Sequence, residues 1–217
     1  MNVIFDLDGT LIDSAPDIQS MASKILTVLG KPPLSIEETR RFIGEGSAAF
    51  VKRMMQARQI ADTELSFARI HEQFLDEYIG SVDKTVFYPD ALEVLTKLRA
   101  TGFRLGLCTN KPHRATLAVI DHLKIPRLFD ALVAGGMMPK RKPAPDMLQK
   151  VIDDLGGGAS LFVGDSEIDA ETAIRADVPF ALFSGGYRKA PVSRIPHNWR
   201  FEHFSQLNNI VQIAHGN

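Results

Sequence analysis

VIFDLDGTL, at residues 3–11, joins a short apolar run to two aspartates, a glycine and a threonine. The run at residues 3–5 is typical of a buried strand. Side chains at positions i and i+2 of an extended strand point the same way, so Asp6 and Asp8 are expected to project into one space. Two like charges held this close are costly unless a cation lies between them or one carboxyl takes up a proton. An Asp-Gly turn is the alternative for the pair alone.

Composition predicts a globular protein of one or two domains, because 217 residues with 45% hydrophobic content suffice for a real core. The formal net charge of −1 gives no sign of a nucleic-acid or membrane surface. No apolar run approaches the roughly 18 residues of a membrane span, and no signal-peptide pattern is present. One cysteine, Cys108, excludes an internal disulfide. We expect a soluble, cytoplasmic protein, as a monomer or homodimer.

The pattern of helices and strands divides the chain. Residues 14–83 contain only helix and loop signals, including a capping box that begins with Ser35. From residue 86 helices alternate with apolar strands, which predicts a mostly parallel sheet with helices on both faces. We therefore expect a Rossmann-like α/β core at residues 1–13 and 84–217 and an inserted α-helical cap domain at 14–83. The insert would cover the carboxyl end of the first strand, where open parallel sheets bind ligands.

The expected elements follow from apolar spacing and from Gly and Pro stops. Helices are predicted at about 15–29, 36–42, 48–57, 64–79, 89–101, 113–123, 145–155, 167–176 and 205–214. Strands are predicted at 3–5, 103–108, 131–134, 160–163 and 180–183, with Trp199 and Phe201 in a last edge strand.

Polar residues follow three of these strands. Asp6 and Asp8 follow the first, Thr109 and Asn110 the second, and Asp165 the fourth. Because carboxyl ends of parallel strands share one edge, these groups are expected to converge. Their carboxylates are hard oxygen ligands that suit Mg²⁺. Each has a plain alternative: Thr109-Asn110 as a helix cap, and Asp165-Ser166 as another.

Two further residues complete this group. Asp169 follows Asp165 in the chain, and Lys142 lies in the basic loop at residues 140–142. Taken alone, Asp169 would be an acidic residue that stabilises the first turn of a helix. The basic loop, taken alone, would be an ordinary solvent-exposed loop. Together with Mg²⁺ and a strand-end hydroxyl, the lysine makes an anion site suited to phosphate, and an aspartate there can act as a nucleophile.

Four segments in this order resemble the motifs of the haloacid dehalogenase superfamily. They are FDLDGTLIDS at residues 5–14, CTNK at 108–111, KPAP at 142–145 and VGDSEID at 163–169. The resemblance implies that Asp6 is a nucleophile that becomes phosphorylated and that Asp8 is the general acid and base. It implies that Thr109 and Lys142 hold the phosphoryl group and that Asn110 adds an amide donor.

The same resemblance implies a Mg²⁺ cofactor. Asp6, the backbone carbonyl of Asp8, and Asp165 would bind it, with Asp169 positioned beside them. We also assign phosphate or substrate binding to Gly9 and Thr10, which follow the paired aspartates. In the insert, Arg40, Gly44 and Gly46 are assigned to the rest of the substrate; a basic residue that only solvates a helix is the alternative for Arg40.

Asp8 favours phosphate-ester chemistry, because the dehalogenases of the superfamily lack an aspartate at this position. FIGEG at residues 42–46 and GGY at 185–187 resemble phosphoglycolate phosphatases. The expected function is therefore Mg²⁺-dependent hydrolysis of a small phosphorylated metabolite, 2-phosphoglycolate first. The alternatives are another ester (pyrophosphate, a sugar or amino-sugar phosphate, or a nucleotide), a mutase of the phosphoglucomutase kind, and a non-catalytic phosphate-binding protein.

Overall fold

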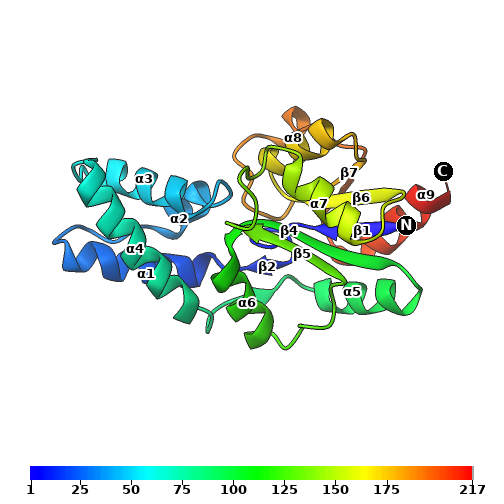
Figure 1. Cartoon of the computed structure of the whole chain (residues 1–217), viewed down its shortest axis with the longest axis horizontal. Helices are drawn as coiled ribbons and strands as arrows, with labels where there is room; N and C mark the ends of the chain where they lie inside the picture. The colour runs from blue at the N-terminus through cyan, green and yellow to red at the C-terminus, as the bar shows by residue number, and fades with distance from the viewer. Residues whose placement is uncertain (217) are drawn as a thin grey trace.

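A parallel sheet forms the centre of the computed structural model, which describes residues 1–216 (Figure 1). Within those residues the sheet has six strands in the order β5-β4-β1-β6-β7-β8. The strands are β1 (Asn2–Phe5), β4 (Arg104–Pro112), β5 (Ala131–Gly135), β6 (Ser160–Gly164), β7 (Phe180–Phe183) and β8 (Trp199–Phe201). Every neighbouring pair is parallel. The predicted α/β fold, including the last edge strand, is confirmed.

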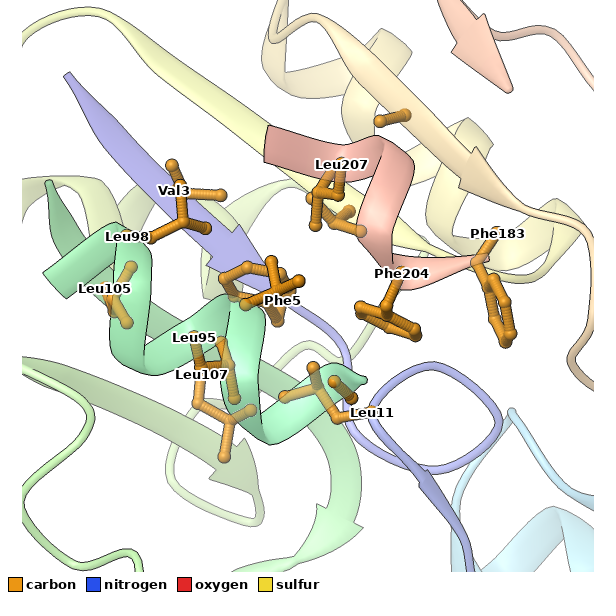
Figure 2. Close-up of a cluster of buried hydrophobic side chains, with 14 of the residues drawn as sticks. Val3, Phe5, Leu11, Leu95, Leu98, Leu105, Leu107, Phe183, Phe204 and Leu207 are labelled. Carbon is orange, nitrogen blue, oxygen red and sulfur yellow. The ribbon is translucent and has the colours of Figure 1, made fainter. Parts of the chain in front are cut away.

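Helices cover both faces of this sheet. One face carries α5 (Ala91–Ala100), α6 (His113–His122) and α9 (Leu207–Gly216), with the short 3₁₀ helix η2 (Phe204–Gln206). The other carries α7 (Asp146–Asp154) and α8 (Glu167–Ala176), with η1 (Val192–Arg194) beside them. Figure 2 shows the first apolar layer, where Phe5 of β1 lies between the side chains of α5 and those around η2. Such burial contributes roughly 1.5–3 kcal/mol for each large side chain.

Four helices lie between β2 (Ile12–Asp13) and β3 (Val86–Phe87), which pair antiparallel in a ribbon of their own. They are α1 (Ala15–Val28), α2 (Ile36–Phe42), α3 (Ser47–Ala57) and α4 (Glu64–Gly80). Figure 1 places them at the end of the molecule away from both termini. Their buried apolar side chains form a separate cluster, which Ala115 and Tyr187 join from outside. These helices therefore bury their apolar faces mainly against one another.

Local sequence signals explain where these helices begin and end. The Ser35 hydroxyl accepts a hydrogen bond from the Glu38 N–H, and the Glu38 carboxylate accepts one from the Ser35 N–H, so the predicted capping box is confirmed. Thr63 and Ser66 form a second one before α4. Both boxes satisfy N–H groups that the first helical turn leaves without partners. Gly30, at φ +65°, follows α1 where the chain reverses.

Strand register brings the polar residues to one edge. Phe5 is level with Leu107 of β4 and with Val163 of β6, so the residues that follow all three emerge together. The predicted end of the second strand at residue 108 is corrected here, because β4 continues to Pro112. Pro112 precedes α6 as its N-cap, so the helix-cap alternative for Thr109 and Asn110 is wrong. The β2–β3 ribbon, with two residues in each strand, was not predicted.

Candidate active site

A cavity lies where the sheet edge meets the inserted helices. From the sheet side it is lined by Asp6, Asp8, Thr109, Asn110 and Lys111. From the insert it is lined by Gly44, Gly46 and Ser47 and by apolar side chains of α1, α3 and α4 and of Ile43. Sequence segments more than 100 residues apart thus share one small space of about 30 Å³.

Three buried carboxylates form a cluster at this edge. Oxygen atoms of Asp6, Asp165 and Asp169 all lie within 4.8 Å of one another. The Lys142 ammonium lies between two of them, 2.8 Å from Asp6 Oδ1 and 2.7 Å from Asp169 Oδ1. Only 1% of the Lys142 side chain is exposed, so these ion pairs are shielded from water. The cluster holds three acids and one base, and its formal charge is −2.

Burial shifts the pKa values of two of these carboxyl groups. Burial raises the pKa of Asp6 to about 7, although Lys142 opposes the shift. Burial, with the charges of Asp169 and Asp6, raises the pKa of Asp165 well above its ordinary value. An opposite charge close by would relieve this cost. Three carboxylates with an unbalanced charge of −2 suit a divalent cation with oxygen ligands, and they fit Mg²⁺ in donor type and in charge.

The turn after β1 supports Asp165. Thr10 Oγ1 donates to Asp165 Oδ1 at 2.7 Å, and the Tyr187 N–H donates to Oδ2 at 2.6 Å. Gly9 has φ +88°, and a Cβ there would lie 2.6 Å from Asp165 Oδ2. A Cβ on Gly186 would lie 2.2 Å from the Gly9 carbonyl oxygen. Both positions therefore require glycine. Gly9 and Thr10 contact the carboxylate cluster and are absent from the cavity lining, where a substrate role had been expected.

Asp8 has a different set of partners from Asp6. Its carboxylate accepts hydrogen bonds from the Ser14 hydroxyl and from the Lys111 ammonium, which lies 3.0 Å from Oδ1 and 3.3 Å from Oδ2. The Asp8 carboxylate is outside the three-acid cluster. Two aspartates two positions apart thus face one cavity in different electrostatic surroundings, which is what distinct chemical roles require.

Thr109 and Asn110 both line the cavity at the end of β4. The Asn110 amide donates to the carbonyl oxygens of Gly44 and Lys142, both at 3.0 Å, and its oxygen accepts from the Lys142 N–H. Asn110 therefore fastens the insert loop and the Lys142 loop to the sheet edge. With both amide hydrogens used in this way, the side chain positions Lys142.

The insert residues named from sequence have two different placements. Gly44 and Gly46 line the cavity, and Gly46, at φ +87°, precedes α3 as its N-cap. Arg40 is not among the lining residues. Its guanidinium lies 3.0 Å from Asp13 Oδ2 in a partly exposed ion pair. Arg40 thus lies away from the cavity, because its long side chain reaches the Asp13 carboxylate outside the cavity.

Sequence reasoning missed Lys111 and gave Tyr78 and Tyr187 no role. Lys111 lines the cavity and its ammonium lies 3.0 Å from the Tyr78 hydroxyl. The Tyr187 hydroxyl accepts from the Ser14 and Ala15 N–H groups, at the junction of β2 and the insert. A signal for Lys111 was present: two positions after Thr109 in a strand, it faces the same side.

The cavity gathers carboxylates and the Lys111 ammonium, a set of groups that suits chemistry on a bound anion. The model of the haloacid dehalogenase-like hydrolases matches residues 3–183. A phosphoglycolate phosphatase of Cereibacter sphaeroides is 40% identical over 97% of this chain and 97% of the relative, and one of Rhodobacter capsulatus is 36% identical over 97% and 96%. A Haemophilus somnus 129PT structure, described as that of a predicted phosphoglycolate phosphatase, matches with a TM-score of 0.91 at 28% identity, over 97% of each chain.

The chain belongs to the haloacid dehalogenase-like hydrolase family. It is an enzyme of the phosphatase class within that family, as its sequence motifs predicted. In residues 1–216 no helix combines the length and the apolar character needed to cross a bilayer.

Proposed function

We propose that this enzyme hydrolyses 2-phosphoglycolate to glycolate and phosphate through a phosphorylated Asp6. The observation that carries the proposal is the pair of aspartates at the end of β1. Asp6 faces Lys142 in the carboxylate cluster, whereas Asp8 faces Ser14 and Lys111. The choice of substrate draws on the phosphoglycolate phosphatases at 40% and 36% identity.

In the proposed reaction an Asp6 carboxylate oxygen attacks phosphorus, and the bond from phosphorus to the ester oxygen breaks. Asp8 enters this step protonated and gives its proton to the departing glycolate oxygen; it later takes a proton from the water that attacks phosphorus, which restores its starting state. That second step releases phosphate and restores the Asp6 carboxylate. Thr109 and Lys142 hold the charged phosphoryl oxygens, since positioning and charge neutralisation dominate phosphoryl transfer.

We infer that Asp6, Asp165, Asp169 and the Asp8 backbone carbonyl hold a Mg²⁺ ion. When bound, Mg²⁺ neutralises charge on the phosphoryl oxygens and on the cluster. Thr10 and the Tyr187 N–H keep Asp165 oriented for this purpose. The buried, uncompensated charge of Asp6, Asp165 and Asp169 supports the proposal.

We also propose that the chain has two domains: residues 14–83 form a cap domain, and residues 1–13 and 84–217 form the catalytic core domain. The separate apolar cluster of α1–α4 supports this division. The near-neutral net charge of −1 supports a small metabolite, and neither nucleic acid nor a membrane, as the partner. A cytoplasmic monomer or homodimer is the form we propose.

The test is phosphate release from a panel of esters, with Mg²⁺ and with a chelator. The panel contains 2-phosphoglycolate, pyrophosphate, sugar phosphates and nucleotides. We expect selective hydrolysis of 2-phosphoglycolate that the chelator abolishes. Hydrolysis centred on another ester would refute the substrate and keep the mechanism. Asp6→Asn is the matched variant: near-normal activity in it would refute Asp6 as the nucleophile, because a carboxamide does not form the acyl phosphate.

A further inference from the structure

We propose that Lys111 binds the carboxylate of the substrate and thereby selects short phosphate esters that carry a carboxylate beside the ester carbon. The inference rests on the proposed function and names the residue that would recognise this substrate. Lys111 is at the end of β4, with 1% of its side chain exposed. Its ammonium contacts the Asp8 carboxylate and the Tyr78 hydroxyl, and it lies 4.3 Å from the centre of the Tyr78 ring.

Among the described residues that line the cavity, Lys111 is the only cationic side chain; Lys142 contacts Asp6 in the carboxylate cluster and is outside this lining. The basic residues of the insert have other partners. Arg40 pairs with Asp13, Arg53 with Glu45, and the Lys52 ammonium lies 5.2 Å from the centre of the Phe67 ring. None of these three cations lines the cavity. A negative group inside this cavity would therefore meet Lys111, whereas Lys189 and Arg141 line neighbouring pockets.

The insert side of the cavity wall is largely apolar, so a substrate carboxylate bound there needs the positive charge of Lys111. Ile18, Ile43, Phe50 and Phe74 line it from the insert, so a carboxylate there would lose water and find apolar side chains. Burying an unpaired charge is costly, and a hydrogen-bonded ammonium offsets that cost. Ser47, the first residue of α3, also lines this wall, and a helix N-terminus favours negative charge nearby.

The position of Lys111 also limits substrate length. Its ammonium is hydrogen-bonded to Asp8, the residue proposed to protonate the ester oxygen. A carboxylate that reaches Lys111 must therefore be close to that oxygen. One intervening carbon, as in 2-phosphoglycolate, satisfies this condition. A longer or bulkier ester would place its charge beyond Lys111, against the apolar wall.

The experiment compares 2-phosphoglycolate with ethyl phosphate, which has the same two-carbon chain and no carboxylate. The measured quantity is the ratio of kcat/KM for the two esters. Wild type is expected to prefer 2-phosphoglycolate. Lys111→Met removes the charge and keeps an unbranched chain, and it should lower kcat/KM for both esters because Asp8 loses a partner. The ratio should fall on the order of 10- to 100-fold, the range for a lost hydrogen bond between charged groups.

Two further variants complete the design. Lys52→Met removes an exposed cation that also lies over an aromatic ring, and the ratio should not change. Tyr78→Phe keeps the wall of the cavity and removes one partner of Lys111, so the ratio should fall about threefold. Tyr78→Phe carries the test if Lys111→Met does not fold.

Equal losses for both esters in Lys111→Met and Tyr78→Phe would mean that Lys111 only supports Asp8, and would overturn this inference alone. A wild-type enzyme that hydrolyses ethyl phosphate as well as 2-phosphoglycolate would overturn it too, while phosphatase activity stands. A wild-type enzyme that hydrolyses neither ester would overturn the proposed function, and this inference with it.

Discussion

Replacing Lys142 by Met should destabilise the folded protein strongly. The Lys142 ammonium is the positive charge between Asp6 and Asp169, at 2.8 and 2.7 Å, and its side chain is 1% exposed. The substitution keeps most of the side-chain volume and leaves three buried carboxylates with no cation between them. Removing one partner of a buried ion pair typically costs about 3–5 kcal/mol in free energy of unfolding. For a chain of this size each kcal/mol lowers Tm by about 2–4 °C, so we expect a fall of about 10 °C.

The measurement is urea denaturation in the presence of a chelator, followed by circular dichroism, together with a thermal scan. Lys150→Met is the matched control. Lys150 pairs with Asp154 one helical turn away on α7, with 47% of its side chain exposed, and such pairs contribute about 0.3–0.5 kcal/mol. Adding Mg²⁺ should recover part of the loss in Lys142→Met, because a cation bound to the folded state stabilises it.

Equal stability of Lys142→Met and Lys150→Met in chelator would refute this reasoning. It would mean that the three carboxylates do not carry their charges in the folded protein, and that Lys142 contributes little to holding them together. If Lys142→Met loses the expected stability and Mg²⁺ restores none of it, the electrostatic role of Lys142 stands. The proposed cation site would then be refuted.

Three further predictions concern the two aspartates and the junction with the insert. Burial raises the pKa of Asp6 from 3.8 to about 7 in the folded protein. Between these pH values the folded state keeps a proton on Asp6 that the unfolded chain has lost, so the free energy of unfolding falls as pH rises. In chelator, Asp6→Asn should therefore gain stability relative to wild type from pH 4 to 7; a difference independent of pH in urea titrations would contradict this. Asp8→Asn should slow hydrolysis of alkyl phosphates more than that of aryl phosphates, whose leaving groups need less protonation, and equal slowing in steady-state assays would argue against the acid role. Tyr187→Phe leaves the Ser14 N–H without its acceptor and removes the hydrogen bond from the hydroxyl to Asp13, whereas the Ala15 N–H keeps Asp13 Oδ1. It should cost about 1–3 kcal/mol, measured by calorimetry, with an unchanged Tm as the contrary result.

Much of the fold was predictable because its signals are local and repeated. Apolar runs, capping residues and Gly stops recur along the chain, and the parallel sheet follows from their alternation. The β2–β3 ribbon was not predictable, since two residues in each strand give no alternation to detect. The length of β4 was also underestimated. Its apolar character ends at Cys108, but pairing with β5 extends to Pro112, and that pairing depends on tertiary contacts.

The same distinction applies to the candidate site. Parallel pairing of β1 with β6 brings Asp6, Asp8 and Asp165 to one edge of the sheet, and the pattern of strands in the sequence predicted that arrangement. The chemical roles of these residues stay predictions. The partners of long side chains are a different matter. Arg40 pairs with Asp13, and Lys111 pairs with Asp8, although sequence pattern favoured neither arrangement. A flexible cation reaches several positions, so its partner depends on which carboxylates the fold places nearby.

We expect the inserted helices to move when a substrate binds. A cavity of about 30 Å³ holds roughly two or three water molecules, which is less room than a two-carbon phosphate ester needs. Within residues 1–216, three polar contacts join the loop at residues 44–46 to parts of the chain outside the inserted helices. Asn110 donates to the Gly44 carbonyl oxygen, Arg141 to the Glu45 carbonyl oxygen, and the Lys189 ammonium lies 3.1 Å from Glu45 Oε1. The partly exposed Lys189–Glu45 ion pair contributes about 0–1 kcal/mol, and each of the two hydrogen bonds contributes about 0.5–1.5 kcal/mol. Opening would therefore break these contacts around the loop at residues 44–46 and, at α4, the buried hydrogen bond between the Lys111 ammonium and the Tyr78 hydroxyl. It leaves the carboxylate cluster intact, because Lys142, Thr10 and the Tyr187 N–H hold that cluster from the sheet side.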